Sequence, residues 1–179
     1  MDGKAYLASA LEEFHKLREL AEKAIGQVSP DQLFYAPGPE SNSIAIIMKH
    51  VGGNLRSRWS DVLTTDGEKP FRNRDAEFEK EQADTAQSVR AEWDRGWDTV
   101  LATFAALKPE QAEARMTIRG EPFTVLQATQ RSLTHTSQHV GQIVFLAKLV
   151  TGAGWKTLSI PRGQSAAFNQ APRPYHQKG

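Results

Sequence analysis

Cysteine is absent from this chain of 179 residues. Without a thiol, the chain can form no disulfide framework, no cysteine-rich zinc site and no iron–sulfur cluster, and it has no cysteine nucleophile. Any transition-metal site must therefore be built from His, Asp or Glu side chains. The length is that of one ordinary domain, which can bury enough surface to fold without a disulfide or a structural metal.

The chain also lacks a large net charge and long apolar runs. Its 22 Lys and Arg residues oppose 21 Asp and Glu residues, and the formal net charge of +1 excludes the strongly basic balance of a dedicated nucleic-acid binder. The longest apolar runs, Ile44–Met48 and Ile143–Ala147, are far shorter than the roughly 20 residues of a membrane-spanning helix. Residues 1–20 have no apolar stretch typical of a secretory signal. We therefore expect a cytoplasmic protein with no nucleic-acid or membrane partner.

Apolar residues recur every three or four positions in four long stretches, which is the pattern of amphipathic helices. The stretches cover residues 4–25, 41–65, 85–107 and 124–150. Thr124 and Gln127 match a capping box at the start of the last stretch. Gly52 and Gly53, inside the second, indicate close packing with a neighbouring helix. Since strand signals are almost absent, the pattern predicts an all-α fold built as a four-helix bundle.

The segments between and after these stretches carry signals of their own. Residues 117–123 alternate apolar and polar side chains around a glycine, which predicts a short hairpin before the fourth helix. Residues 68–84 form a loop long enough to cross the bundle. From Trp155 onward the chain has no apolar period, which predicts an irregular C-terminal tail. We expect one domain over residues 1–168, including a docked first part of the tail, and a disordered end over residues 169–179.

Two of the five histidines, His135 and His139, are one turn apart on the fourth predicted helix. At about 100° per residue, His139 is expected at the centre of the apolar stripe and His135 beside it. A buried imidazole needs a hydrogen-bond partner or a metal, and an i,i+4 pair suits one divalent metal, as in zinc proteases. Thr136 stands where those proteases have glutamate, so a thermolysin-like mechanism is not supported. The pair alone leaves open both a metal site and a pair of surface or hydrogen-bonded core histidines.

A tight metal site needs a third ligand. His50 lies on the flank of the apolar stripe of the second predicted helix, where a side chain can meet the fourth helix. Asn54, one turn further on, shares that face and could orient a ligand or a water molecule. The remaining histidines are His15, beside two glutamates, and His176, near the C-terminus.

Four blocks of the sequence together resemble the DinB-like (DinB/YfiT-like) superfamily, in its branch of uncharacterised bacterial proteins. The blocks are NSIAIIMKH at 42–50, DGEKP with RNRDAEF at 66–78, HVGQIVFLAK at 139–148 and WKTLSIPRGQS at 155–165, within a match over about residues 41–169. The resemblance implies a four-helix bundle with up-down-down-up topology. It also implies a divalent metal, zinc ahead of nickel, held by one histidine of the second helix and two of the fourth. In this sequence the matching residues are His50, His135 and His139.

Relatives of known activity in that superfamily are thiol-dependent S-transferases and isomerases, and many pair as homodimers. The resemblance thus implies a homodimeric, metal-dependent enzyme that acts on a small molecule with a low-molecular-weight thiol. A metal-dependent hydrolase, and a non-enzymatic metal-binding, small-molecule-binding or dimerisation protein of a stress response, are the alternatives. We expect Asn54, Arg58 and Gln142 to contact the substrate, and no residue is assigned as catalytic.

Overall fold

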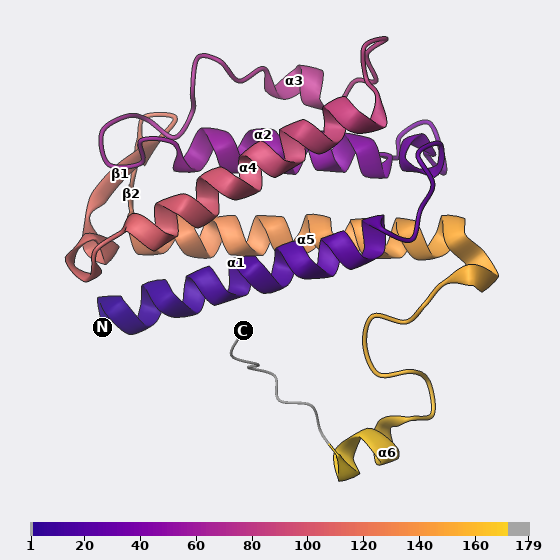
Figure 1. Ribbon diagram of the computed structural model, residues 1–179. Coiled ribbons are helices and arrows are strands. Elements are labelled where there is room, and N and C mark those ends of the chain that lie inside the picture. Colours follow the sequence, from indigo (N-terminus) through magenta and orange to yellow (C-terminus); the bar gives the residue numbers. More distant parts are fainter. Residues whose placement is uncertain (1, 172–179) are drawn as a thin grey trace.

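The computed structural model describes residues 2–171 and is mostly helical (Figure 1), in agreement with the predicted all-α class. Its α-helices are α1 Gly3–Ile25, α2 Ile44–Trp59, α3 Arg74–Glu77, α4 Ala86–Ala106, α5 Val125–Thr151 and α6 Ser165–Gln170. Its strands are β1 Arg115–Ile118 and β2 Glu121–Thr124. Short 3-10 helices cover Gln32–Phe34, Pro109–Glu113 and Gly152–Gly154.

The long helices begin at side-chain caps that satisfy free backbone N–H groups. Thr124 accepts a hydrogen bond from the Gln127 backbone, and the Gln127 side chain accepts one from the Thr124 backbone, so the predicted capping box of α5 is confirmed. Ser43 caps α2 in the simpler way, by accepting a hydrogen bond from Ile46 N–H. α2 ends at Trp59, six residues before its predicted end, because the backbone turns extended at the next residue.

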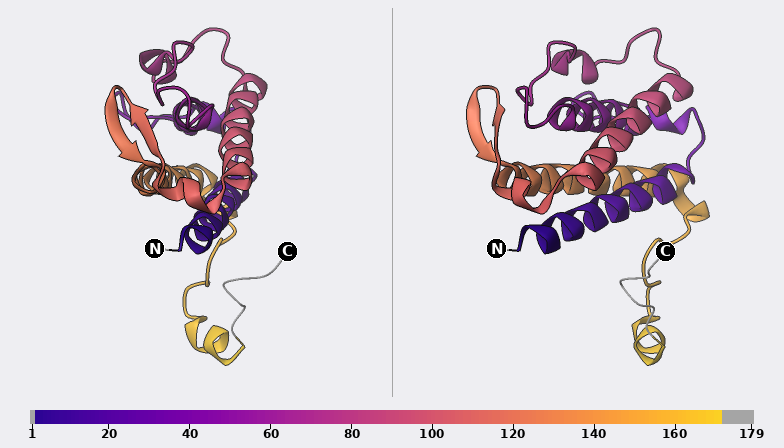
Figure 2. Two further views of the ribbon diagram at one scale, coloured as in Figure 1. Left: turned by 90° about the vertical axis from the view of Figure 1, so that its left-hand side faces the viewer. Right: turned by 60° about the vertical axis from the view of Figure 1, so that its left-hand side comes forward.

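The four long helices pack around a core rich in aromatic side chains. α2 packs on α4 and on α5, and α1 packs on α4 and on α5. In Figures 1 and 2, α1 and α5 run in one direction while α2 and α4 run in the other. Phe14 of α1 lies between Trp59 of α2 and Trp97 of α4, with ring centroids 6.3 and 6.5 Å away. Edge contacts of this kind add to the hydrophobic stabilisation of the core.

Two helices approach so closely that glycine is required where they meet. A Cβ atom on Gly96 of α4 would lie 2.6 Å from the Cα atom of Gly52 on α2. A Cβ atom on Gly52 would lie 2.6 Å from the carbonyl oxygen of Glu92. The expected close packing at Gly52 is thus confirmed, with α4 as the neighbour, and the contact is backbone against backbone.

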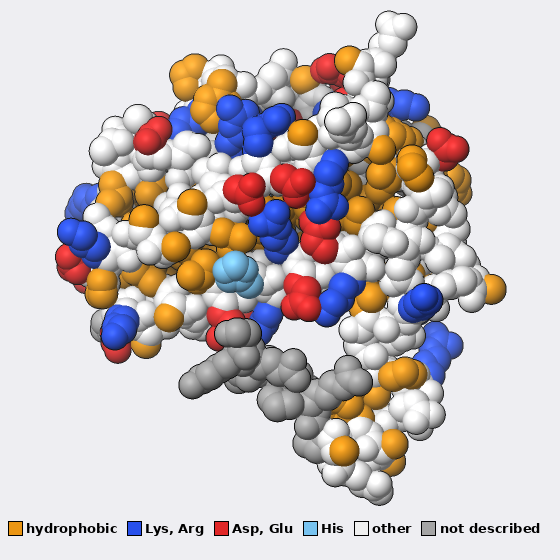
Figure 3. All heavy atoms as spheres, in the orientation of Figure 1, with side chains coloured by type: hydrophobic (Ala, Val, Ile, Leu, Met, Phe, Trp, Pro, Cys, Tyr) orange, Lys and Arg blue, Asp and Glu red, His pale blue; other side chains and the backbone are white. Residues whose placement is uncertain are grey.

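Ion pairs connect α1 and α4 along the outer edge of their contact, where Figure 3 shows acidic and basic side chains alternating. Arg18 of α1 contacts Asp94 at 3.3 Å and Asp98 at 2.9 Å. Arg90 of α4 contacts Glu22 at 2.8 Å. Each partly exposed pair of this kind contributes little to the free energy of folding. The pairs therefore serve to align α1 with α4 more than to stabilise the fold.

The hairpin of β1 and β2 is present where the sequence predicts it, and an acidic side chain anchors its turn. Asp66, in the loop after α2, accepts hydrogen bonds from the backbone N–H groups of Arg119 at 2.8 Å and Gly120 at 2.9 Å. Hydrogen bonds from the backbone of Glu68 and from Gly120 hold the pKa of Asp66 well below its usual range. The anchor fixes the hairpin beside the loop that leads to α3 (Figure 2).

Two short helices occur where the sequence predicts irregular chain. α3 lies inside the predicted loop, and Asn73 caps it by accepting from Ala76 N–H. α6 lies in the predicted irregular tail, buries none of its residues, and is drawn apart from the long helices in Figure 1. The predicted boundary at residue 168 stays a prediction, and most of the predicted disordered end, residues 172–179, lies outside the described residues. Within residues 2–171, no helix combines the length and the apolar character that crossing a membrane requires.

Candidate metal centre

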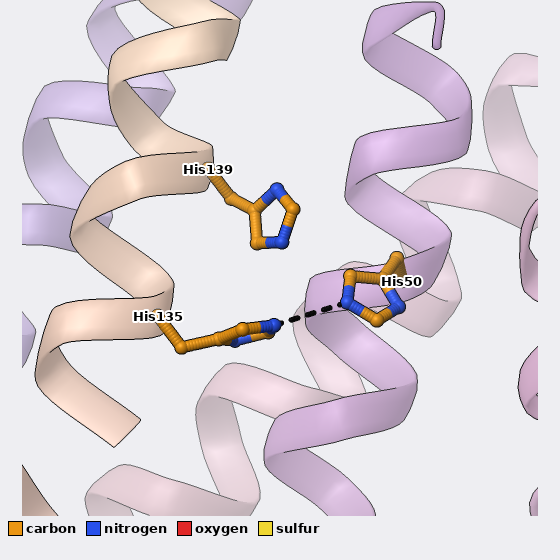
Figure 4. A group of neighbouring side chains, drawn as sticks. All are labelled: His50, His135 and His139. Atoms are coloured by element: carbon orange, nitrogen blue, oxygen red, sulfur yellow. Dashed lines mark hydrogen bonds between the residues drawn. The ribbon is translucent and has the colours of Figure 1, made fainter. Parts of the chain in front are cut away.

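Three histidines meet between α2 and α5 (Figure 4). His50 projects from α2, and His135 and His139 project from successive turns of α5, with the three rings facing one another. Ring centroids are 5.1 Å apart for His50 and His135, 4.9 Å for His50 and His139, and 4.6 Å for the pair on α5. One ring nitrogen from each residue lies within 4.8 Å of the other two. The structure thus brings together the three histidines that the resemblance selected.

The burial of these three histidines differs from what the apolar stripes of α2 and α5 predict. His50, expected at a flank, is buried, whereas His135 and His139 are half-buried. The centre of the buried stripe of α5 is Thr136, which is 0% exposed, so the expectation for His139 was wrong. The reason is that small hydroxyl residues such as Ser132 are buried on this face, and a count of apolar side chains does not detect them. The two α5 histidines therefore stand at the edge of the core.

A buried carboxylate holds the ring of His50. Nδ1 of His50 lies 2.9 Å from Oε2 of Glu77, at the end of α3. Arg72 donates to both carboxylate oxygens of Glu77, from Nε at 2.7 Å and from Nη2 at 2.8 Å. Burial opposes the charge of Glu77, but the hydrogen bonds from Arg72 and His50 outweigh it, and its pKa is lowered. A charged Glu77 favours the tautomer of His50 with the proton on Nδ1, which turns the lone pair of Nε2 toward α5.

Gly53 makes room for this carboxylate. A Cβ atom on Gly53 would lie 2.9 Å from Cδ of Glu77 and would overlap one carboxylate oxygen. The two consecutive glycines of α2 therefore have different roles, since Gly52 admits the backbone of α4 while Gly53 admits the Glu77 side chain.

The two α5 histidines have contrasting surroundings. Nδ1 of His139 lies 2.8 Å from Oε1 of Gln142, one turn along the same helix. Nε2 of His135 lies 3.1 Å from Nε2 of His50, whereas Nδ1 of His135 is buried with no hydrogen-bond partner among the described residues. An unpartnered buried polar atom costs free energy, so the position of His135 is not explained by packing alone.

Both α5 histidines are held in the neutral form. Burial lowers the pKa of His135 to about 3, and repulsion from His139 and His50 adds to the effect. Burial also lowers the pKa of His139, against the hydrogen bond to Gln142. A metal ion binds the neutral imidazole, so a lowered pKa reduces competition from protons at neutral pH.

The donor set fits a divalent transition metal. In a tetrahedral zinc site with metal–nitrogen distances near 2.0 Å, two ligand nitrogens are roughly 3.3 Å apart, and the Nε2 atoms of His50 and His135 are 3.1 Å apart. Histidines that bind metals usually donate their second ring N–H to a carboxylate or another acceptor. Glu77 is such an acceptor for His50 and Gln142 for His139. Three imidazoles leave coordination positions free for water or a substrate, as in catalytic sites.

A pocket of about 420 Å³ opens beside the three histidines, with His50 and His135 in its wall. Asn54 and Arg58, both expected to contact substrate, also line it. Arg58 already binds the Gly67 carbonyl oxygen and Glu68, the latter at 3.1 Å. Gln142, the third expected substrate contact, is exposed and bonded to His139. Substrate contacts by these three residues stay predictions.

Glu77 and Arg72 were missed by reasoning from the sequence. Both lie within one of the blocks that carry the resemblance, residues 66–78, but no periodicity marks them in a segment that reads as a polar loop. The signal that could have found them is chemical, because a metal-binding histidine needs an acceptor for its second N–H. Of the other histidines, His15 is exposed on α1, and His176 lies outside the described residues.

Comparison with known proteins assigns a family but no activity. A family model described as "Protein of unknown function (DUF1572)" matches residues 2–164. Comparison with curated proteins gave no match. The matched region includes all three histidines and the loop that carries Glu77, so the whole candidate centre lies within it.

Proposed function

Since the chain belongs to the DUF1572 family, whose function is unknown, we propose its function from the site: the protein binds one divalent metal ion through His50, His135 and His139. The observation that carries this proposal is the meeting of three ring nitrogens within 4.8 Å. Support comes from the carboxylate behind His50 and from the Gln142 side-chain oxygen beside Nδ1 of His139. Zinc is the first candidate and nickel the second, because neutral imidazoles suit both ions.

We further propose that the bundle has the up-down-down-up topology of the DinB-like superfamily. The shared direction of α1 with α5, and of α2 with α4, supports this proposal (Figure 1). So does the long connection between α2 and α4, which lets the chain return to the end where α2 began.

The proposed activity is transfer of a low-molecular-weight thiol to a small electrophilic substrate. When bound, the metal would lower the pKa of the thiol and so supply a thiolate at neutral pH. The residues of the chain would hold the metal, keep His135 and His139 neutral and shape the pocket for the substrate. In support, the pocket of about 420 Å³ has the size of a small-molecule site, and the chain itself contains no thiol.

Metal titration tests the first part of the proposal. Metal-free protein is expected to bind one zinc ion per chain, and to unfold at a higher temperature with zinc because the ion binds the folded state. Absence of saturable binding of zinc and of nickel would refute the metal site. For the activity, zinc-loaded protein is mixed with glutathione, bacillithiol or mycothiol and an electrophilic acceptor. Conjugation that is no faster than with metal-free protein for every thiol would refute the transferase and favour a binding role.

Glu77→Gln is expected to weaken zinc binding about 10- to 100-fold, the usual effect of losing a partner behind a metal ligand. The amide keeps the shape of the side chain but removes the charge that His50 and Arg72 bind. Zinc affinity is measured by competition with a chelating dye. Glu79→Gln, at an exposed position two residues away, is the control and should bind zinc like the wild type. Equal affinities for all three proteins would show that Glu77 does not support the ligand.

A homodimer is proposed from an apolar surface on α5. Phe145 is 68% exposed and Leu149, one turn further, is 50% exposed. The two side chains are neighbours on one helix face, and contiguous exposed apolar surface marks interaction sites when it is large. Light scattering at micromolar concentration should give twice the 19.9 kDa of the chain, and a value near 20 kDa would refute the dimer.

A further inference from the structure

The pocket beside the histidines is lined by positive side chains. Within residues 2–171, its wall contains no Asp or Glu. Its guanidinium groups come from α2, from the loop and helix that follow it, from the hairpin and from α5; they are Arg58, Arg72, Arg74, Arg119 and Arg131. Such a concentration of one charge in a hollow attracts ions of the opposite sign.

Some of these arginines have their charge already balanced by glutamates. Glu68 contacts Arg58 at 3.1 Å and Arg119 at 2.8 Å, so both guanidinium groups serve to fix the loop and the hairpin. Glu77 binds Nε and Nη2 of Arg72. The two glutamates thus contact three of the five arginines. They leave one guanidinium nitrogen of Arg72 without a partner among the described residues.

That nitrogen is Nη1 of Arg72, which is buried and has no hydrogen-bond partner among residues 2–171. The Arg72 side chain is 2% exposed, and Nη1 lies 3.9 Å from Oε1 of Glu68, beyond hydrogen-bond distance. A buried guanidinium N–H without an acceptor is costly. Arg72 lies in the wall of the pocket, so after a small shift of its side chain a ligand there would supply an acceptor for Nη1 and remove that cost.

Arg131 supplies a second uncommitted charge at the same pocket. It is exposed, and within the described part of the chain it makes no ion pair shorter than 4.0 Å. It lies one turn before His135 on α5, so the two side chains share a face of the helix.

The rest of the wall combines apolar side chains with uncharged polar ones, among them Asn54 and Gln138. Trp59, Met116, Ile118 and Ala128 line the pocket together with the arginines. A ligand that fits would therefore carry an anionic group at one end and an uncharged body with both apolar and polar parts. Guanidinium groups bind both carboxylate and phosphate, because their N–H groups match the spacing of two oxygens.

We propose that this pocket binds a small molecule through a carboxylate or phosphate group, which accepts hydrogen bonds from Nη1 of Arg72 and from Arg131. The inference deepens the proposed function and rests on it for one point only, that the anion would bring the substrate to the metal held by His135 and its partners. The anion site itself requires no metal.

Isothermal titration calorimetry of metal-free protein with inorganic phosphate and with succinate tests the site. Both probes carry the group that the arginines would recognise, and the stronger binder identifies which oxyanion the pocket prefers. Arg131→Gln is expected to weaken binding of that probe about fivefold to tenfold. The substitution removes a charged hydrogen bond, whose contribution is reduced because the side chain is exposed. Arg131→Lys should retain more affinity than the glutamine variant, and binding should weaken as salt is raised.

Arg115→Gln is the matched control, because the substitution removes the same charge. Arg115 is exposed on β1 and does not line the pocket. Equal anion affinities for Arg131→Gln and Arg115→Gln, or no binding of either probe to the wild type, would overturn the inference. Zinc titration of the same proteins separates the two proposals. Anion binding without zinc binding would refute the proposed metal and keep the anion site, and zinc binding without anion binding would do the reverse.

Discussion

His135→Ala is expected to lower zinc affinity by at least about a hundredfold. The substitution removes one of three nitrogen donors, and loss of a supporting partner alone costs 10- to 100-fold in affinity. The metal-free protein should fold nearly as well as the wild type, because Nδ1 of His135 has no hydrogen-bond partner among the described residues and alanine removes that cost. Zinc at a hundred times its dissociation constant stabilises a folded protein by about 2.7 kcal/mol. This stabilisation should disappear in the variant.

The measurement is the unfolding temperature with and without zinc, together with metal content after purification without a chelator. His15→Ala is the control, since His15 is an exposed histidine on α1, away from the centre. It should keep both the metal and the zinc-dependent rise in unfolding temperature. Equal metal content in His135→Ala and the wild type would show that His135 is not a ligand.

The helices were the most predictable part of this protein because their signals are local. The capping box at Thr124 and the apolar period of α5 depend on residues within a few positions of one another. α3 was not predicted, since its four residues are too few to show a period. Its position depends on contacts that the loop makes with the body of the protein, of which the hydrogen bond between Glu77 and His50 is one.

The candidate centre could be predicted in its ligands but not in its support. Spacing on one helix identified His135 and His139 as a pair, and the resemblance selected His50. Glu77 reaches His50 across 27 residues of chain, and no local pattern encodes a contact of that kind. The anion site is harder to predict from the sequence than the metal ligands are. Arg72 and Arg131 meet at one pocket only after α2, α3 and α5 have packed together.

The close contact of α2 and α4 makes Gly96 sensitive to any added side-chain atom. Gly96→Ala is expected to reduce the free energy of unfolding by about 3 kcal/mol, at the upper end of the usual cost of overpacking. The added Cβ atom would lie 2.6 Å from Cα of Gly52, and a backbone cannot yield as a flexible side chain does. The two helices would have to separate, and the contacts of Trp93 and Trp97, which are fully buried on the same helix, would loosen.

Gly141→Ala provides a control in which the same chemical change has the opposite sign. Gly141 is also inside a helix, but a Cβ atom there would meet nothing within 4 Å. Alanine should therefore stabilise the protein by about 0.5–1 kcal/mol, the difference in helix propensity between the two residues. Urea unfolding followed by circular dichroism measures both variants. If Gly96→Ala lowers the free energy of unfolding by no more than about 1 kcal/mol, α2 and α4 can adjust to the added atom. Gly52 and Gly96 would then not determine how closely these helices pack.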